Sequence, residues 1–284
     1  ATTEIYTGTT SSAASDVYKR QGIHRPELHW APSGLPGWMR GLPGWAARGL
    51  SEARLPAEVA TLLASDLLRD PHLPRGTGAS VLLVPGFGFG DPSLLPLHLV
   101  LRRMGYRTVR SGIVSNIDCS DRTVDGLAEV AEQAVEHDGE RVQVVGQSRG
   151  GMLARGLGAR RPDLVSRAIN LGGPLNDEFA FYEIPSPLVS AIYASHRVRS
   201  PMPEPRCLRP DCRCPYMQAV HRPMPEQTEL VSIYTASDGI IDWRSCVVPG
   251  ARAVRVESSH LGMGVDPRVL RVVISELARP LPVG

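Results

Sequence analysis

The residues with the clearest chemical meaning form the run Gly146-Gln147-Ser148-Arg149-Gly150, a serine with a glycine two positions away on either side. A short apolar segment precedes the run, and a segment rich in alanine and leucine follows it. A strand that turns sharply into a helix with this pattern holds a serine hydroxyl above a sheet, where it can act as a nucleophile. The glycines suit such a turn, because a Cβ at either position would collide with the neighbouring strand or helix. The pattern alone is weak evidence, so its interpretation depends on partners for the serine.

Two apolar segments further along the chain each lead into a residue that a serine nucleophile needs. The segment 230–235 reads as a strand and is followed by Asp238, and the segment 253–256 reads as the next strand and is followed by His260. A histidine can take the serine proton, and an aspartate can fix the tautomer of that histidine. Asp242 is the alternative acid. We prefer Asp238 because it follows its strand directly.

A glycine-rich loop upstream could stabilise negative charge on a reacting carbonyl oxygen. The apolar run 79–84 reads as a buried parallel strand and ends in the loop 85–90, Pro-Gly-Phe-Gly-Phe-Gly. Acyl transfer needs two backbone N–H groups aimed at the developing oxyanion. We predict that Phe87 supplies one and that Arg149, the residue after the serine, supplies the other. The loop has neither the glycine spacing of dinucleotide-binding loops nor the lysine of a phosphate-binding loop.

Strand and helix patterns alternate through the middle of the chain. The predicted strands are 80–84, 106–113, 141–146 and 165–171, and the predicted helices are 92–104, 121–137, 148–160 and, last in the chain, 267–278. Such alternation with short connections predicts an α/β fold, a mostly parallel sheet with helices on both faces. Active sites of these sheets lie at the carboxyl ends of the strands. Phe87, Ser148, Asp238 and His260 all follow such ends.

The block 81–173 and the order Ser148, Asp238, His260 resemble the α/β-hydrolases, in particular bacterial lipases and esterases. The resemblance runs from about Gly76 to the end of the chain, apart from residues 174–227. It implies a serine hydrolase that cleaves carboxylic esters through an acyl-enzyme, acts on a small ester or lipid, and needs no cofactor or metal. Lipases commonly carry His-Gly in the oxyanion loop and Gly-His-Ser at the serine, where this chain has Pro85-Gly86 and Gly146-Gln147-Ser148.

Two alternatives to an esterase stay open at this point. An acyltransferase would use the same three residues with an alcohol in place of water. A non-catalytic binding protein with this fold would not need all three residues, and their joint presence favours an enzyme.

The resemblance divides the chain into a core and additions to it. The predicted hydrolase core comprises residues 76–173 and 228–284, and the proline-dense insertion 174–227 is a predicted cap, because long insertions in compact domains tend to be lids or binding loops. We expect this cap to cover Ser148. Its aromatic candidates for an acyl pocket are Phe179, Phe181, Tyr182 and Tyr193.

The beginning of the chain has two parts. Residues 1–21 resemble the translation of a sequencing adapter, and Lys19 is the only lysine among 31 lysines and arginines, so we expect this tail to be non-native. Residues 22–75 are predicted to be an N-terminal arm with a doubled Leu-Pro-Gly-Trp element, turn-rich up to Leu50, followed by a helix over 55–69 whose leucines lie largely on one face.

The five cysteines allow three interpretations. Cys207, Cys212 and Cys214 cluster as C-x4-C-x-C, which lacks the paired C-x2-C spacing of most zinc sites, while Cys119 and Cys246 stand apart. A disulfide from the cluster to Cys246 is compatible with the sequence if the protein is exported, and free thiols and a metal site are the two other interpretations.

Composition bears on the partners. The net charge is +2 and no basic run stands out, which argues against nucleic acid. No apolar stretch reaches membrane-spanning length, so we expect a soluble protein without stable membrane insertion, either cytoplasmic or secreted. The oligomeric state is not indicated.

Overall fold

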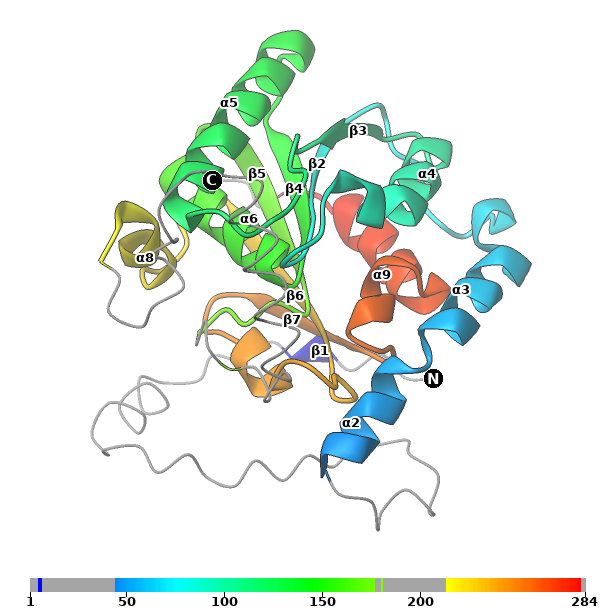
Figure 1. The fold of residues 1–284 in the computed structure, drawn as a ribbon. Coiled ribbons are helices and arrows are strands. Elements are labelled where there is room, and N and C mark those ends of the chain that lie inside the picture. The colour runs from blue at the N-terminus through cyan, green and yellow to red at the C-terminus, as the bar shows by residue number, and fades with distance from the viewer. Residues whose placement is uncertain (1–4, 7–43, 177–179, 181–212, 282–284) are drawn as a thin grey trace.

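A six-stranded parallel sheet forms the centre of the protein (Figure 1). The computed structural model describes residues 5–6, 44–176, 180 and 213–281. The parallel strands lie in the order β7-β6-β5-β4-β2-β3. Their bounds are β2 (Ser80–Val84), β3 (Arg107–Arg110), β4 (Val142–Gln147), β5 (Val165–Leu171), β6 (Glu229–Thr235) and β7 (Arg252–Val256). The predicted parallel sheet is therefore confirmed, and its strands lie within two or three residues of the predicted segments.

Helices cover both faces of the sheet (Figure 1). One face carries α4 (Leu95–Arg103) and α9 (Pro267–Leu277), and the other carries α5 (Ser120–Asp138), α6 (Arg149–Arg160) and α8 (Pro215–Val220). Successive strand residues point to opposite faces, so Val81 and Leu83 enter the α4–α9 core whereas Leu82 and Val84 enter the α5–α6 core. Burial on both faces explains why these strands read as continuous apolar runs. None of the helices in the described ranges is long and apolar enough to cross a membrane.

The N-terminal arm is helical where the structure describes it. It contains α2 (Gly44–Glu52), α3 (Leu55–Ala64) and the short 3-10 helix η2 (Leu67–Arg69). The prediction of a turn-rich arm missed α2, and the single helix predicted over 55–69 breaks after Ala64. The predicted leucine face is right only in part. Leu67 is buried and Leu62 packs on the core, but Leu63 is 83% exposed whereas Glu58 is only 5% exposed. Glu58 is buried because its carboxylate binds a loop that follows β7, as shown below.

A two-residue strand, β1 (Ile5–Tyr6), pairs antiparallel with β7 at the edge of the sheet. An edge strand presents unpaired backbone groups that an extended segment of almost any sequence can bind. This pairing therefore does not test the non-native origin of residues 1–21, which stays a prediction.

The C-terminal part of the 174–227 insertion, residues 213–227, packs on the α5–α6 face. The Tyr216 amide donates to Asp121 of α5 at 2.9 Å, and the Arg155 side chain of α6 donates to the carbonyl of Arg222 at 3.3 Å. Residues 177–179 and 181–212, with the four aromatic candidates for an acyl pocket, lie outside the described residues. The predicted cap over Ser148 therefore stays a prediction.

A buried charge network joins the amino ends of the strands to the end of α9. Arg167 of β5 is fully buried, with its guanidinium 2.7 Å from the Glu229 carboxylate. The same guanidinium donates to the carbonyl of Glu276 at 2.7 Å and to the side chain of Gln143 at 3.0 Å. Because the last carbonyls of a helix have no partner within it, Arg167 caps α9 while it links three strands.

Candidate active site

Ser148 lies at the turn between β4 and α6 and has unusual backbone geometry. Its φ of +54° and ψ of −123° make it the only residue other than glycine with a positive φ in the described part of the chain. This region is sterically unfavourable for a residue with a side chain, so the surrounding structure must hold the turn. The Ser148 amide donates to the carbonyl of Leu171 in β5 at 2.7 Å. Backbone strain of this kind is common at functional sites, which keeps Ser148 a candidate nucleophile.

The flanking glycines are required by close backbone contacts. A Cβ on Gly146 would lie 2.0 Å from the carbonyl oxygen of Gly150, and a Cβ on Gly150 would lie 2.2 Å from that of Val84. No side chain tolerates such distances. The steric reason given for the glycines from the sequence is therefore correct.

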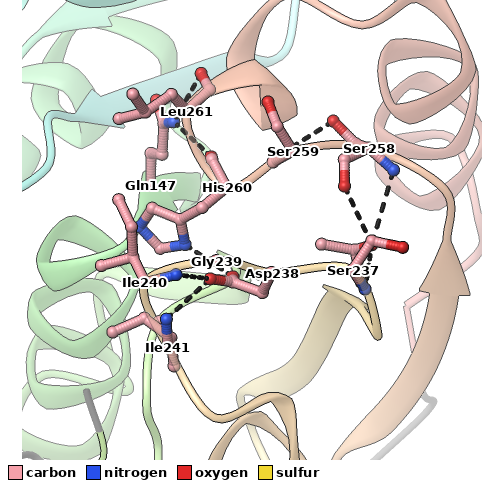
Figure 2. Close-up of polar contacts among 12 residues, drawn as sticks. Gln147, Ser237, Asp238, Gly239, Ile240, Ile241, Ser258, Ser259, His260 and Leu261 are labelled. Atoms are coloured by element: carbon pink, nitrogen blue, oxygen red, sulfur yellow. Dashed lines mark hydrogen bonds and ion pairs between the residues drawn. The ribbon is translucent and has the colours of Figure 1, made fainter. Parts of the chain in front are cut away.

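Asp238 and His260 meet in a buried hydrogen bond. His260 Nδ1 lies 2.6 Å from Asp238 Oδ2, and the two residues are 3% and 1% exposed (Figure 2). The second oxygen, Asp238 Oδ1, accepts the amides of Ile240 at 2.8 Å and Ile241 at 2.7 Å. A carboxylate only accepts hydrogen bonds, so Nδ1 carries the proton and the neutral ring presents Nε2 as an acceptor.

The surroundings of His260 favour its protonated form. Burial by itself lowers the pKa of the imidazole, but the charge of Asp238, the hydrogen bond to Asp238 and the charge of Glu52 outweigh it. The pKa of His260 therefore lies above its ordinary value. A ring in this setting accepts a proton more readily than a histidine in water.

Asp242, the alternative acid, has a different role. Its side chain accepts the amide of Arg244 at 3.2 Å at the start of the 3-10 helix η5 (Trp243–Cys246), and it pairs with the Arg244 guanidinium at 3.3 Å. The structure thus brings Asp238, and not Asp242, to His260.

Two contacts bring the serine turn close to the other loops. Gln147 Nε2 donates to the carbonyls of His260 at 3.2 Å and Leu261 at 3.3 Å, so the residue before Ser148 holds the histidine loop (Figure 2). A Cβ placed on Gly86 would lie 3.5 Å from the Cβ of Ser148, which places the glycine-rich loop against the serine. The glutamine that departs from the lipase pattern thus has a structural use here.

Asn116 fixes the glycine-rich loop. Its side-chain Nδ2 donates to the carbonyl of Pro85 at 2.6 Å, its amide donates to Phe89 at 2.8 Å, and its carbonyl accepts from Gly88 at 3.1 Å. These bonds hold the backbone on both sides of Phe87. This role could not be predicted from the sequence, because a single asparagine in a loop has no distinctive spacing.

Arg149 connects that same asparagine to the serine turn. Its buried guanidinium donates to the carbonyl of Asn116 at 2.7 Å and to Ser120 Oγ at 3.1 Å, binds the carbonyl of Asp118, and lies 6.0 Å from the centre of the Phe87 ring. Arg149 is also the first residue of α6, so its amide lies at the positive end of the helix dipole.

Two glutamates of the N-terminal arm bind the loops that carry His260 and Asp238. Glu52 accepts the amides of Gly239, His260 and Leu261 at 3.0, 3.0 and 2.9 Å. Glu58 accepts the amide of Ser259 at 2.7 Å and its hydroxyl at 2.6 Å. Neither was predicted as a site residue. For Glu58, the available signal was its position inside the leucine-rich helix predicted over 55–69.

No disulfide joins the cysteines that the structure describes, which are Cys119, Cys214 and Cys246. A bond from Cys214 to Cys246 is therefore absent, while Cys207 and Cys212 lie outside the described residues. Burial and the charge of Asp238 raise the pKa of the Cys246 thiol well above its ordinary value. Within the described ranges, no group of three histidine, cysteine, aspartate or glutamate side chains is arranged to hold a metal ion.

One solved structure in particular supports the assignment of the fold. The mature lipase BlEst2 of Bacillus licheniformis superposes with a TM-score of 0.51 at 14% sequence identity, over 73% of this chain and 96% of the lipase. An extracellular α/β-hydrolase from a Paenibacillus species and the monoacylglycerol lipase of Paleococcus ferrophilus superpose with a TM-score of 0.46 each. Their identities are 12% and 15%, over 71% and 72% of this chain and 100% and 96% of theirs.

No family model and no curated protein sequence matches the chain. The strand order, the strained serine turn and the superposition on the lipase nevertheless agree. The chain has the α/β-hydrolase fold. At 14% identity the likeness defines the fold and leaves the substrate open.

Proposed function

We propose that this protein is a serine hydrolase that cleaves carboxylic esters through an acyl-enzyme on Ser148. The observation that carries the proposal is the buried Asp238–His260 hydrogen bond, which is tied through Gln147 to the turn that bears Ser148. A purely structural serine would not need a strained backbone in a turn that is tied to the loop of a buried, oriented imidazole.

In the proposed first half-reaction, Ser148 Oγ attacks the ester carbonyl carbon while His260 Nε2 takes the hydroxyl proton. The carbonyl oxygen becomes an oxyanion, which accepts hydrogen bonds from the backbone N–H groups of Phe87 and Arg149. Asp238 stabilises the imidazolium without itself taking the proton. The tetrahedral intermediate then breaks the bond to the alkoxy group, which leaves as the alcohol with the proton from His260.

In the second half-reaction, water replaces the alcohol. His260 takes a proton from the water as its oxygen attacks the acyl carbon, and the proton then passes to Ser148 Oγ as the acyl bond breaks. The products are a carboxylic acid and the free enzyme. The chain's own residues complete this cycle without a cofactor.

A fluorophosphonate probe, which reacts with activated serines, tests the proposal. The folded wild-type protein should be labelled and should hydrolyse nitrophenyl esters. The Ser148→Ala variant should lose labelling, and its turnover should fall on the order of 10⁴-fold or more, with its melting temperature nearly unchanged. A panel of acyl chain lengths would then define the acyl preference.

Ser275→Ala is the matched control, because the hydroxyl of this exposed serine on α9 donates to the carbonyl of Arg271, within its own helix. It should keep full labelling. Labelling that survives Ser148→Ala, or a folded wild-type protein that neither reacts with the probe nor hydrolyses any ester of the panel, would overturn the proposal.

A further inference from the structure

The two arm glutamates differ in what they contact. Both carboxylates bind the loop after β7, but only Glu52 also reaches the loop after β6, through the amide of Gly239. One Glu52 oxygen, Oε1, accepts from both Gly239 and His260, and these two amides flank the Asp238–His260 pair. Glu52 therefore bridges the loops that carry the acid and the base.

The helix that carries Glu52 fits tightly against the Asp238 loop. A Cβ on Gly239 would lie 2.5 Å from the carbonyl oxygen of Arg48, one turn earlier in α2. Ser51 Oγ also donates to the carbonyl of Ser237, just before the acid. These contacts leave α2 little freedom to move away from the pair, so the Glu52 carboxylate is held in place from its own helix.

The charges around His260 come from several elements. The titratable groups packed about the ring and its loop are Asp238 after β6, Cys246 in η5, Glu52 from α2, Glu58 from α3, and the Asp266–Arg268 pair at the start of α9. Apart from Asp238, Glu52 is the carboxylate whose charge raises the pKa of His260. Glu58 faces Arg268 and the serines of the loop.

We infer that Glu52 is a positioning residue for the Asp238–His260 pair, which holds the two loops in register through backbone amides and adds negative charge behind the imidazole. The inference rests on the proposed function, because it assigns a role to Glu52 in the reaction of Ser148. A helix that precedes all six parallel strands in sequence thus becomes part of the active site.

The test compares Glu52→Gln with Glu58→Gln in the full chain. Glutamine has nearly the same shape as glutamate but has no charge and only one oxygen that accepts hydrogen bonds. Histidine titration is followed by NMR with 13C-labelled histidine, and the His260 signal is assigned by its loss in His260→Gln. Glu52→Gln should lower the pKa of His260 and move the acidic limb of the kcat/KM profile to lower pH, with kcat reduced about tenfold because the pair is less well oriented.

Glu58→Gln should move the pKa of His260 less, although it loosens the same loop. A third variant, Glu52→Asp, keeps the charge but shortens the reach, so it should keep the pKa near that of the wild type while kcat falls. It also keeps the test decisive if Glu52→Gln does not fold. Equal pKa shifts for Glu52→Gln and Glu58→Gln, or none for either, would overturn the inference.

Failure of this inference and failure of the proposed function give different results. The histidine titration does not require turnover, so it reports on Glu52 even in an inactive protein. If the wild type reacts with the fluorophosphonate probe but Glu52→Gln leaves the pKa of His260 unchanged, the inference alone is wrong. If the wild type does not react, the function is wrong whatever the titration shows.

Discussion

The two oxygens of Asp238 have different partners, and this difference separates its structural role from its proposed chemical role. Oδ1 accepts two backbone amides, while Oδ2 faces Nδ1 of His260. Asp238→Asn can keep the first oxygen in place and so preserve the loop. It would put an NH2 group against Nδ1, which forces the ring proton onto Nε2 and removes the base.

We therefore expect Asp238→Asn to lower kcat by on the order of 10⁴, by analogy with serine proteases, at nearly constant melting temperature. Asp242→Asn is the matched control and should cost far less, since the Asp242 side chain caps η5 and pairs with Arg244. Initial rates with a nitrophenyl ester check both variants. The reverse ranking would give the role to Asp242.

The raised pKa of His260 predicts the direction of the pH dependence. The base must be neutral to accept the Ser148 proton, so activity is lost as pH falls through the pKa of the imidazole. Because the net effect of its surroundings raises that pKa, the acidic midpoint of kcat/KM should lie above the ordinary value of 6.5. A profile measured with an uncharged ester checks this, and a midpoint below that value would contradict it.

At the scale of elements, Arg149 links the start of α6 to the glycine-rich loop through Asn116. Arg149→Met keeps the backbone N–H proposed for the oxyanion but removes the guanidinium. Buried carbonyls of the 116–120 segment then lose their donor, at a cost of roughly 1–3 kcal/mol each. We expect a lower melting temperature and a kcat reduced about tenfold, since the Phe87 amide loses its fixed position.

Arg122→Met is the control for this variant. Arg122 lies on α5 and makes a loose, exposed ion pair with Asp118 at 3.9 Å. It should change neither the melting temperature nor kcat appreciably. Thermal unfolding and ester turnover, measured for both variants, check the prediction, and similar behaviour of the two would remove Arg149 from the support of the loop.

The comparison of sequence with structure is also clearest at this scale. Ser148, Asp238 and His260 could be found because each follows an apolar strand, and parallel strands bring their carboxyl ends to one edge. Glu52 and Glu58 could not, because their partners lie about two hundred positions away and no local pattern encodes such contacts.

The predicted buried face of α3 was partly wrong for the same reason. A row of leucines normally marks the buried face of a helix. Here the loop after β7 offers amides that a carboxylate must meet, so Glu58 faces inward and Leu63 faces outward. Tertiary hydrogen bonds outweighed hydrophobic periodicity in a helix of only ten residues.

At the scale of the whole molecule, the two ends of the sheet have separate roles. The carboxyl end carries the proposed chemistry, while the amino end carries the Arg167 network. Arg167→Met should lower the free energy of unfolding by about 3–5 kcal/mol, because it leaves buried acceptors without their donor. Its kcat/KM should stay near that of the wild type, because the contacts of Arg167 within the described residues lie at the amino ends of the strands and at the end of α9.

Arg161→Met, which removes partly exposed ion pairs to Asp163 and Glu132, should cost less than about 1 kcal/mol. Urea unfolding of both variants checks the contrast. A large loss of activity in folded Arg167→Met would show that the two ends are coupled.

The contacts of the arm glutamates also bear on how the protein acquires its activity. The bond from Glu52 to the His260 amide spans 208 positions, and the bond from Glu58 to Ser259 spans 201. Contacts between residues this distant in sequence form slowly. During synthesis, α2 and α3 also leave the ribosome long before the loop after β7 that they bind. Ester turnover should therefore be among the last properties to return on refolding, after the sheet has formed.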